Sequence, residues 1–521
     1  MLATVDRQQG FFDAAWCSEL LPEGSIYSLL AEHGDRIVRD QDFADCYSEA
    51  SGRPSIPPSL LAKVLLLAYR DELSDERAME AVRFDLRWKV ALDLPVDHPG
   101  FHPTSLVRFR ARLLLHGKER LVFEPSLEVA TELGLISGQA EQILDSTPML
   151  GAAAVQDTAT LVRSGVRKLL DAVKAADPEG AAGRASGLRF EYANPRRKPA
   201  GDWQDKAARM ELLGEVALDA TRALRVVEED DELIEDERVA AAARLLREIV
   251  GQEFALADNE LPRPRGGRRS RQIVSAEDAE MRHGRQAAAR HYTGYKIHAA
   301  ADAQAPILTA ISLSAANEHD GHHAGALVDQ QRTERRPQRV IGDTAYGNIE
   351  AREELAERSV AVLAPVHSTS PKDGSIPKDE FRIDLETDTV TCPQGKTTPI
   401  YKPRPSGPSK TGTGSPASRG PTANPARFAT DAHRAASGIS ASAAARTCAR
   451  LRCRRYPIPI STTISTGCDR RIERLLGLIV HRYRGRKSRY LGARKSALQA
   501  LWTAVLVNLH PIGAALRAEA A

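Results

Sequence analysis

Two neighbouring segments with a two-residue hydrophobic period constrain the fold of this chain more than any other feature. Residues 294–302 and 307–314 both alternate apolar and polar side chains, and a short turn at residues 304–306 joins them. Alternation of this kind places one face of a strand in a core and the other face outside it. The two segments therefore predict a β-hairpin.

Further short apolar runs on either side of the hairpin predict the rest of a sheet. Ile143 and Leu144 precede the hairpin, whereas Val340 and Ile341 follow it. A helical segment, IEAREELAERS, and a last apolar run, VAVLAPV, come next. The order strand, hairpin, strand, helix, strand is typical of a mixed α/β sheet. We place this sheet domain at residues 138–398.

Helices are predicted before the sheet. Ser74 is a suitable N-cap for one of them, and Arg108, Arg110 and Arg112 alternate with apolar side chains in SLVRFRARLLL. A series of helices that ends in a basic one suits a helix-turn-helix type of DNA-binding domain. An ordinary helical bundle also exposes arginines, so both interpretations stay open. We assign residues 1–125 to this all-α domain, for DNA binding or dimerisation.

A second helical region interrupts the predicted sheet domain. Residues from about 158 to 285 contain faces rich in Ala, Leu and Arg at helical spacing, which predicts a helical insertion. The acidic run EEDDELIEDE, from Glu228 to Glu237, offers carboxylates to a metal ion. Consecutive like charges are more typical of a solvated face, which is the interpretation we favour.

Three carboxylates are candidates for chemistry. Asp145 and Asp343 each follow a short apolar strand, and Glu473 lies beside a helical apolar stripe that includes Ile472 and Leu475. Carboxylates at strand ends occur at the active sites of open α/β folds, although aspartate there is also a common turn residue. Oxygen ligands suit hard cations such as Mg²⁺, which can activate the attacking oxygen and stabilise the leaving oxygen in phosphoryl transfer.

The net charge of +3 hides a strong asymmetry along the chain. Residues 401–521 carry 22 Lys and Arg against four acids, a local net charge of +18, so residues 1–400 carry −15. Clustered cations bind polyanions by releasing the counterions condensed on phosphates, which favours nucleic acid as the partner. A solvated basic tail is the alternative interpretation of the same charge.

Several motifs occur together in one order: ILDSTPM, GYKIHAAAD, ANEHDG, VIGDTAYGN and a C-terminal run that begins RIERLLGLIVHRYRGRKSRYLGARK. In this order and spacing the chain resembles the DDE transposases of bacterial insertion sequences, of the insertion-sequence-four and five type. The segment GRPSIPPSLLAKVLLLAYR and the residues after it look like the helical domain that precedes the catalytic domain in one branch of that family. The resemblance covers about residues 40–400 and 470–510.

The resemblance implies an RNase H-like catalytic domain that binds two Mg²⁺ ions, with Mn²⁺ as an alternative. Such an enzyme cuts transposon ends and joins the freed 3′ hydroxyl to target DNA. Asp145, Asp343 and Glu473 match the three acids that would be both catalytic and metal-binding. His319 and Asp320 match a recurrent family stretch, which a turn after a core strand explains nearly as well. The DNA phosphates would contact a run of guanidinium groups, one ammonium group and one phenol, which belong to Arg484, Arg486, Lys487, Arg489 and Tyr490.

Residues 399–468 depart from the family pattern. They are rich in Pro, Ser, Thr, Gly, Ala and Arg and lack sustained periodicity, which predicts disorder. Because family motifs flank the segment, a compensated pair of frameshifts in the gene is our hypothesis for it, and helices at 469–521 then complete the catalytic domain. Cys392, Cys448 and Cys453 are candidate zinc ligands, but their spacing matches structural zinc sites poorly.

Length and composition set the remaining expectations. A chain of 521 residues holds several domains, and no apolar run reaches the roughly 18 residues of a membrane span. The first residues lack the pattern of a signal peptide, so we expect a cytoplasmic, nucleoid-associated protein. Transposases of this kind act as homodimers or larger assemblies on terminal inverted repeats and target DNA. The alternatives are a catalytically inactive remnant that only binds DNA, and a nuclease without strand transfer.

Overall fold

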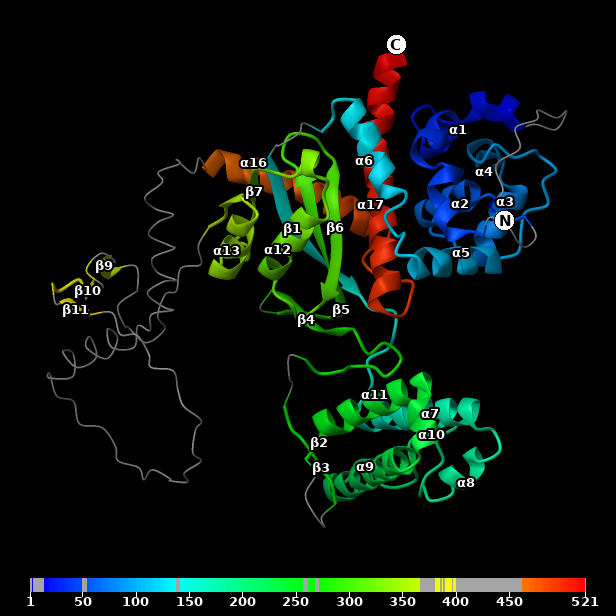
Figure 1. Ribbon diagram of the computed structural model, residues 1–521, viewed down its shortest axis with the longest axis vertical. Helices are drawn as coiled ribbons and strands as arrows, with labels where there is room; N and C mark the ends of the chain where they lie inside the picture. Colours follow the sequence, from blue (N-terminus) through cyan, green and yellow to red (C-terminus); the bar gives the residue numbers. More distant parts are fainter. Residues whose placement is uncertain are drawn as a thin grey trace. The chain divides into compact units, whose positions relative to one another are not determined.

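The computed structural model of the chain divides into two compact units (Figure 1). The larger unit comprises Met1–Gln338 and Arg470–Ala521, and the smaller unit comprises Arg339–Asp469. The structure describes residues 2, 14–48, 54–136, 141–255, 261–267, 271–287, 289–365, 380–384, 387, 389–395, 397–399 and 462–520.

The N-terminal part of the larger unit is helical. Its central helix, α2, is buried along nearly its whole length, which agrees with the apolar run in its sequence. Ser74 caps α3 as predicted, because its Oγ accepts a hydrogen bond from the Arg77 N–H at 3.3 Å. The α-helices are α1 (Ile26–Ile37), α2 (Pro58–Arg70), α3 (Asp75–Phe84), α4 (Leu86–Ala91), α5 (Thr104–Leu115) and α6 (Phe123–Glu132).

The sheet of the larger unit is built around one long strand. Strand β5 (Arg290–Asp302) pairs antiparallel with β1 (Glu141–Leu150), β4 (Arg282–Ala287) and β6 (Leu308–Ala315). The pairing of β5 with β6 confirms the predicted hairpin. Gly294 has φ +146°, and an added Cβ there would collide with the Met149 carbonyl oxygen, so the close approach of β5 to β1 requires glycine.

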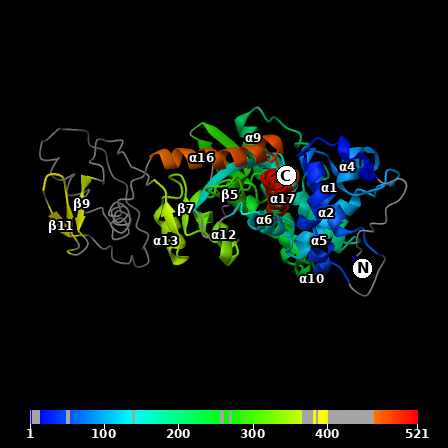
Figure 2. The same ribbon diagram turned by 90° about the horizontal axis from the view of Figure 1, so that it is seen from above.

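The C-terminal helix α17 (Ala493–Ala520) contacts both the sheet and the N-terminal helices, as Figures 1 and 2 show. On the sheet side, the buried Asn508 amide accepts from the Leu308 N–H at 2.8 Å and donates to the Leu308 carbonyl at 2.9 Å, which satisfies backbone groups of β6. On the other side, Trp502 packs edge-on against Phe109 of α5 with ring centroids 6.2 Å apart. The N-terminal helices and the sheet therefore share α17 as a packing partner.

A helical insertion follows β1 and has its own apolar core. Its main helices α7, α9 and α11 pack side by side (Figure 1). Within the predicted acidic run, Asp230 and Asp236 cap the two helices that follow them, and the flanking acids are mostly exposed, which supports the solvated-face interpretation. The elements are α7 (Thr158–Ala176), α8 (Ala181–Ala185), α9 (Lys206–Glu228), α10 (Asp231–Glu235), α11 (Glu237–Glu253), β2 (Phe254–Ala255) and β3 (Arg263–Pro264).

The smaller unit contains a short strand, helix, strand motif. Strands β7 (Arg339–Ile341) and β8 (Ala361–Leu363) are parallel, and α13 (Ile349–Glu357) connects them. Its other described strands, β9 (Arg382–Asp384), β10 (Thr389–Thr391) and β11 (Thr397–Pro399), form an antiparallel sheet. The predicted mixed α/β fold preceded by helices is thus confirmed. No helix in the described part of the chain is long and apolar enough to cross a membrane.

Candidate active site and DNA-binding surface

Asp145 lies in the middle of β1. The sequence pattern had placed it at the end of a core strand, but β1 continues to Leu150. Side chains alternate along a strand, so the carboxylate shares its face with Ile143 and Thr147, which are 1% and 8% exposed. Asp145 itself is half-buried, and its Oδ1 accepts a hydrogen bond from the Ser146 N–H at 2.7 Å. The strand therefore holds this carboxylate in a defined direction.

Asp343 lies just beyond the end of β7, as predicted. Gly342 still donates to the Leu363 carbonyl of β8 at 3.1 Å, and the turn begins at the next residue. The Asp343 Oδ1 accepts from the Ala345 N–H at 2.9 Å, which is the usual way an aspartate stabilises such a turn. The side chain is exposed, so its carboxylate reaches solvent.

Glu473 lies on α16 (Thr462–Gly477), which continues into a π-helical turn at Leu478–Arg482. The predicted apolar stripe is confirmed, because Ile472, Leu475 and Leu476 are at most 4% exposed. Glu473 is exposed on the other side of the helix.

These three carboxylates are chemically suited to a divalent metal ion. Asp145 and Glu473 belong to the larger unit, and Asp343 belongs to the smaller unit. Within the described residues of either unit, no three His, Cys, Asp or Glu side chains gather closely enough to hold a metal. The donor set itself is three hard oxygen ligands, which fits Mg²⁺ or Mn²⁺ and does not fit a soft metal.

The arginines of α5 do not share one environment. Arg108 is exposed, whereas Arg112 lies half-buried over the Tyr47 ring at 4.1 Å. Arg110 is 9% exposed and donates to both carboxylate oxygens of Asp75, at 2.9 and 2.5 Å. Burial alone would lower the pKa of Arg110, but hydrogen bonding to Asp75 and the nearby Tyr490 raise it above its ordinary value. Arg110 is therefore a buried cation whose charge the protein itself pairs.

The predicted DNA-contacting segment Arg484–Tyr490 is anchored to the end of β1. The Leu150 N–H donates to the Arg486 carbonyl at 2.7 Å, and the Ser488 N–H donates to the Leu150 carbonyl at 2.8 Å. These backbone bonds extend the sheet by one parallel bridge. The segment is therefore held next to the strand that carries Asp145.

The side chains of this segment divide into two groups. Lys487 is exposed, Arg486 is half-buried, and Arg484 is 71% exposed while it pairs with Glu72 at 3.0 Å. Arg489 and Tyr490 instead contact α2 and the turn that follows it. Arg489 donates to the Leu73 carbonyl at 2.9 Å and lies over the Tyr69 ring, and the Tyr490 hydroxyl is 3.1 Å from that of Tyr69.

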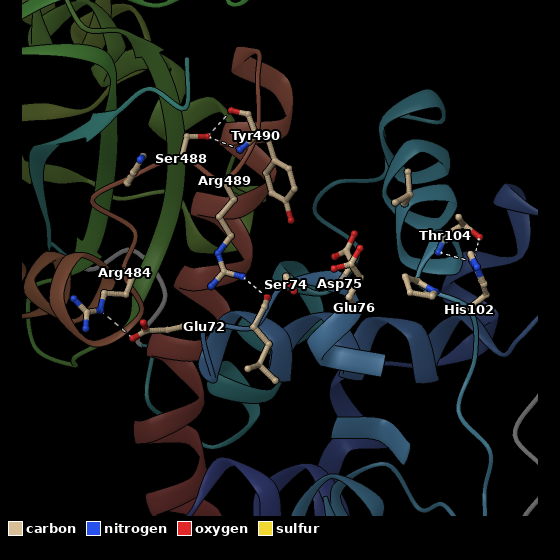
Figure 3. Close-up of a pocket in the computed structure, with 14 residues that line it drawn as sticks. Glu72, Ser74, Asp75, Glu76, His102, Thr104, Arg484, Ser488, Arg489 and Tyr490 are labelled. Carbon is tan, nitrogen blue, oxygen red and sulfur yellow. Dashed lines mark hydrogen bonds and ion pairs between the residues drawn. The ribbon is translucent and has the colours of Figure 1, made fainter. Parts of the chain in front are cut away.

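A groove of about 850 Å³ lies between this segment, the turn from α2 to α3 and the start of α5 (Figure 3). Its lining contains two basic side chains, Arg484 and Lys487. It also contains the acidic side chains of Glu72, which pairs with Arg484 at 3.0 Å, and Glu76. The remaining lining residues are Leu73, Ser74, Asp75, His102, Pro103, Thr104, Val107, Ser488, Arg489 and Tyr490.

The motif NEHDG lies directly after β6, and the sequence had left its role open. His319 caps the short 3-10 turn that starts at Asp320, through a bond from the Gly321 N–H at 3.2 Å. Asp320 also contacts Lys296 and Ser146, two partners that the sequence did not single out. The sequence contains one sign of these contacts. Lys296 is a lysine in an otherwise largely apolar strand, and alternation places it on the same face as His298.

Other predictions fall on residues that the structure does not describe. The segment 399–468 lies almost wholly outside the described residues, as do Cys448 and Cys453 of the candidate zinc site. Cys392 is described and is 7% exposed. The disorder, frameshift and zinc hypotheses stay predictions.

Comparison with known families gives two matches. Residues 16–112 match the Transposase domain (DUF772), and residues 262–458 match the Transposase DDE domain. No curated protein and no solved structure matches the chain. The mixed α/β fold and the two matches define a transposase, a class of protein that binds DNA. The two domains, in this order, are consistent with a DDE transposase of insertion-sequence type, a family with an RNase H-like catalytic fold.

The matched spans cover the predicted site unevenly. The DDE match contains Asp343 but neither Asp145 nor Glu473, and it runs through most of the segment 399–468. The N-terminal match contains Arg108, Arg110 and Arg112.

Proposed function

We propose that Asp145, Asp343 and Glu473 are the catalytic acids of this transposase. The observation that carries the proposal is the placement of the three acids on a strand, at the end of a strand and on a helix, in a chain that matches a Transposase DDE domain. An exposed turn presents Asp343, the Ser146 N–H directs Asp145, and the exposed side of α16 presents Glu473.

The proposed reaction is metal-dependent cleavage of transposon ends followed by strand transfer. Bound Mg²⁺ or Mn²⁺ supplies a Lewis acid that stabilises the charge developing on phosphate oxygens. In the first step water attacks the phosphorus at the transposon end, a new P–O bond forms, and the bond to the 3′ oxygen breaks. In the second step the freed 3′ hydroxyl attacks a target phosphodiester and displaces its 3′ oxygen.

Among the predicted DNA-contacting residues, DNA binding is proposed for the cations that are exposed or half-buried and not bound by backbone carbonyls, which are Arg108, Arg112, Arg484, Arg486 and Lys487. A surface ion pair such as Arg484 with Glu72 contributes little stability, so phosphate can replace the carboxylate at low cost. We exclude Arg110, Arg489 and Tyr490 from direct contact because the protein itself binds their polar groups. A homodimer or larger assembly would bring two transposon ends together.

The first prediction concerns Asp343→Asn. The wild-type protein with Mg²⁺ should cut and join a labelled duplex that carries the DNA flanking its own gene. The variant should lose about a thousandfold in rate, about 4 kcal/mol of transition-state stabilisation, because an amide cannot replace the anionic ligand. Its affinity for the same duplex, from a gel shift, should stay within about twofold, since no DNA contact is lost.

Glu353→Gln is the matched control, because it removes one exposed carboxylate from α13 of the same unit. It should change neither rate nor affinity. DNA binding by the wild type without cleavage that depends on Asp343 would favour the catalytically inactive remnant. Cleavage without joining would favour a nuclease.

A further inference from the structure

The loop that follows β6 is hydrogen-bonded to two strands of the sheet, β1 and β5. Asp320 accepts a hydrogen bond from the Ser146 Oγ at 2.8 Å with one carboxylate oxygen. Its other oxygen pairs with the Lys296 ammonium at 2.5 Å. Lys296 also donates to the Glu318 carbonyl at 2.9 Å, which fixes the loop to β5 a second time. One carboxylate thus connects a loop, β1 and β5.

Ser146 is the residue through which this connection reaches Asp145. Its side chain donates to Asp320, and its main-chain N–H donates to the Asp145 Oδ1 at 2.7 Å. Because side chains alternate along a strand, Asp145 and Ser146 point to opposite faces of β1. The loop therefore holds β1 from the face opposite to the proposed catalytic carboxylate.

The surroundings of the connection are shielded from water. The side chains of Lys296 and Asp320 are only 13% and 20% exposed, so their attraction is screened less than that of a surface pair. His298, which lies opposite Ser146 in the strand register, is fully buried and stacks on His323 at 4.1 Å. Burial, then His323 and Lys296, lower the pKa of His298 well below its ordinary value, so the imidazole stays neutral.

We propose that Asp320 is a positioning residue for Asp145, which it holds in the direction needed to bind a divalent cation by fixing Ser146. The inference rests on the proposed function, because it concerns the metal affinity of the same carboxylate. Groups that hydrogen-bond to a metal ligand and orient it commonly contribute about 10- to 100-fold to metal affinity. Asp320 acts through one intervening residue, which puts its effect near the lower end.

The test is the affinity for Mn²⁺ alone, measured by calorimetry on the full chain, together with the Mg²⁺ concentration that gives half-maximal cleavage. Asp320→Asn should raise the Mn²⁺ dissociation constant and the half-saturating Mg²⁺ concentration by about tenfold. The cleavage rate at saturating Mg²⁺ and the DNA affinity should change much less. A loss of folded protein alone would lower the amplitude of binding and would leave both concentrations where they are.

Glu318→Gln is the matched control, because it removes the same charge from the same loop. The Glu318 side chain pairs with His323 at 2.9 Å, and it does not touch Ser146. Both metal constants should stay at the wild-type value in this variant. An equal shift in Glu318→Gln would overturn the proposal, because it would show that loop charge alone sets the affinity.

Ser146→Ala keeps the proposal testable if Asp320→Asn folds poorly. It removes only the hydroxyl and leaves the pair of Lys296 and Asp320 in place. We expect a shift of the same sign and about threefold, with the double variant no worse than Asp320→Asn, as expected when two residues act through one connection. Additive effects in the double variant would contradict the connection through Ser146.

The outcomes separate this inference from the proposed function. If the wild type neither binds Mn²⁺ nor cleaves DNA, the proposed function fails and the positioning role fails with it. If the wild type does both and Asp320→Asn has unchanged metal constants, only the positioning role is overturned.

Discussion

Two basic stretches of this chain, the arginines of α5 and the segment Arg484–Tyr490, look alike in sequence and differ in structure. In α5, residues two apart point in different directions because a helix turns about 100° per residue, so Arg110 is buried while Arg108 is exposed. In the segment, the backbone is fixed to Leu150, and Arg484 and Lys487 reach solvent. Arg489 is instead bound to carbonyl groups of α2 and of the turn after it.

Local charge in the sequence therefore does not identify the cations that are available to DNA. Each stretch uses some of its positive side chains for contacts with distant parts of the chain. Asp75 neutralises Arg110, and the carbonyl groups of Ala68 in α2 and of Leu73 just after it bind Arg489. Only the remaining cations can exchange their counterions for phosphates. Substitution of a buried cation should therefore lower the stability of the protein, whereas substitution of an exposed cation should weaken DNA binding.

Among the substitutions of these cations, Arg110→Met has the largest expected effect, which is on stability. This change keeps most of the side-chain volume but leaves the partly exposed Asp75 carboxylate without its partner. The free energy of unfolding should fall by about 2 kcal/mol, less than for a fully buried pair. Urea denaturation measures the loss, and the DNA affinity of the folded protein should change less than about twofold.

Arg108→Met is the control on the same helix. It should leave the free energy of unfolding unchanged within about 0.5 kcal/mol, because the side chain is exposed. Equal destabilisation by both variants would contradict the different roles assigned to the buried Arg110 and the exposed Arg108.

A smaller effect is expected from the paired change Arg484→Ala and Lys487→Ala. DNA affinity should fall by about tenfold, about 1.4 kcal/mol, with the rate at saturating DNA retained. Loss of two phosphate contacts should also make the slope of log affinity against log salt shallower by about 1.8. Fluorescence anisotropy over a range of salt concentrations measures both quantities.

The matched control removes two exposed arginines from the helical insertion, Arg225→Ala and Arg244→Ala. It changes the net charge by the same amount and should leave the salt slope near the wild-type value. If this control lowers affinity as much as the change at Arg484 and Lys487, the net positive charge of the protein accounts for DNA binding, and the segment Arg484–Tyr490 has no special role in it.

The sequence was sufficient for elements with a clear local pattern. The hairpin of β5 and β6 follows from alternation over many residues, and the cap of α3 follows from Ser74 and the helix after it. Contacts between residues that are far apart in the chain leave no such pattern in the sequence. Nothing near Arg110 indicates Asp75, and nothing near Tyr490 indicates that its partner is Tyr69.

The site was predictable to a similar extent. The exposed turn at Asp343 and the apolar stripe beside Glu473 follow from their neighbours in the sequence. The extent of β1 beyond Asp145 did not, because Pro148 is disfavoured inside strands and only the pairing with β5 shows that the strand continues. The link from Asp320 to Ser146 spans 174 positions and required the fold.

The central claim is that the three acids bind the metal ions of catalysis, and metal rescue of Asp343→Cys tests it most directly. A thiolate binds Mg²⁺ poorly and accepts softer ions such as Mn²⁺ more readily. The account predicts that the variant is inactive with Mg²⁺ and regains part of its DNA cleavage with Mn²⁺, while the wild type uses both ions. Wild-type activity of the variant with Mg²⁺ would contradict the claim.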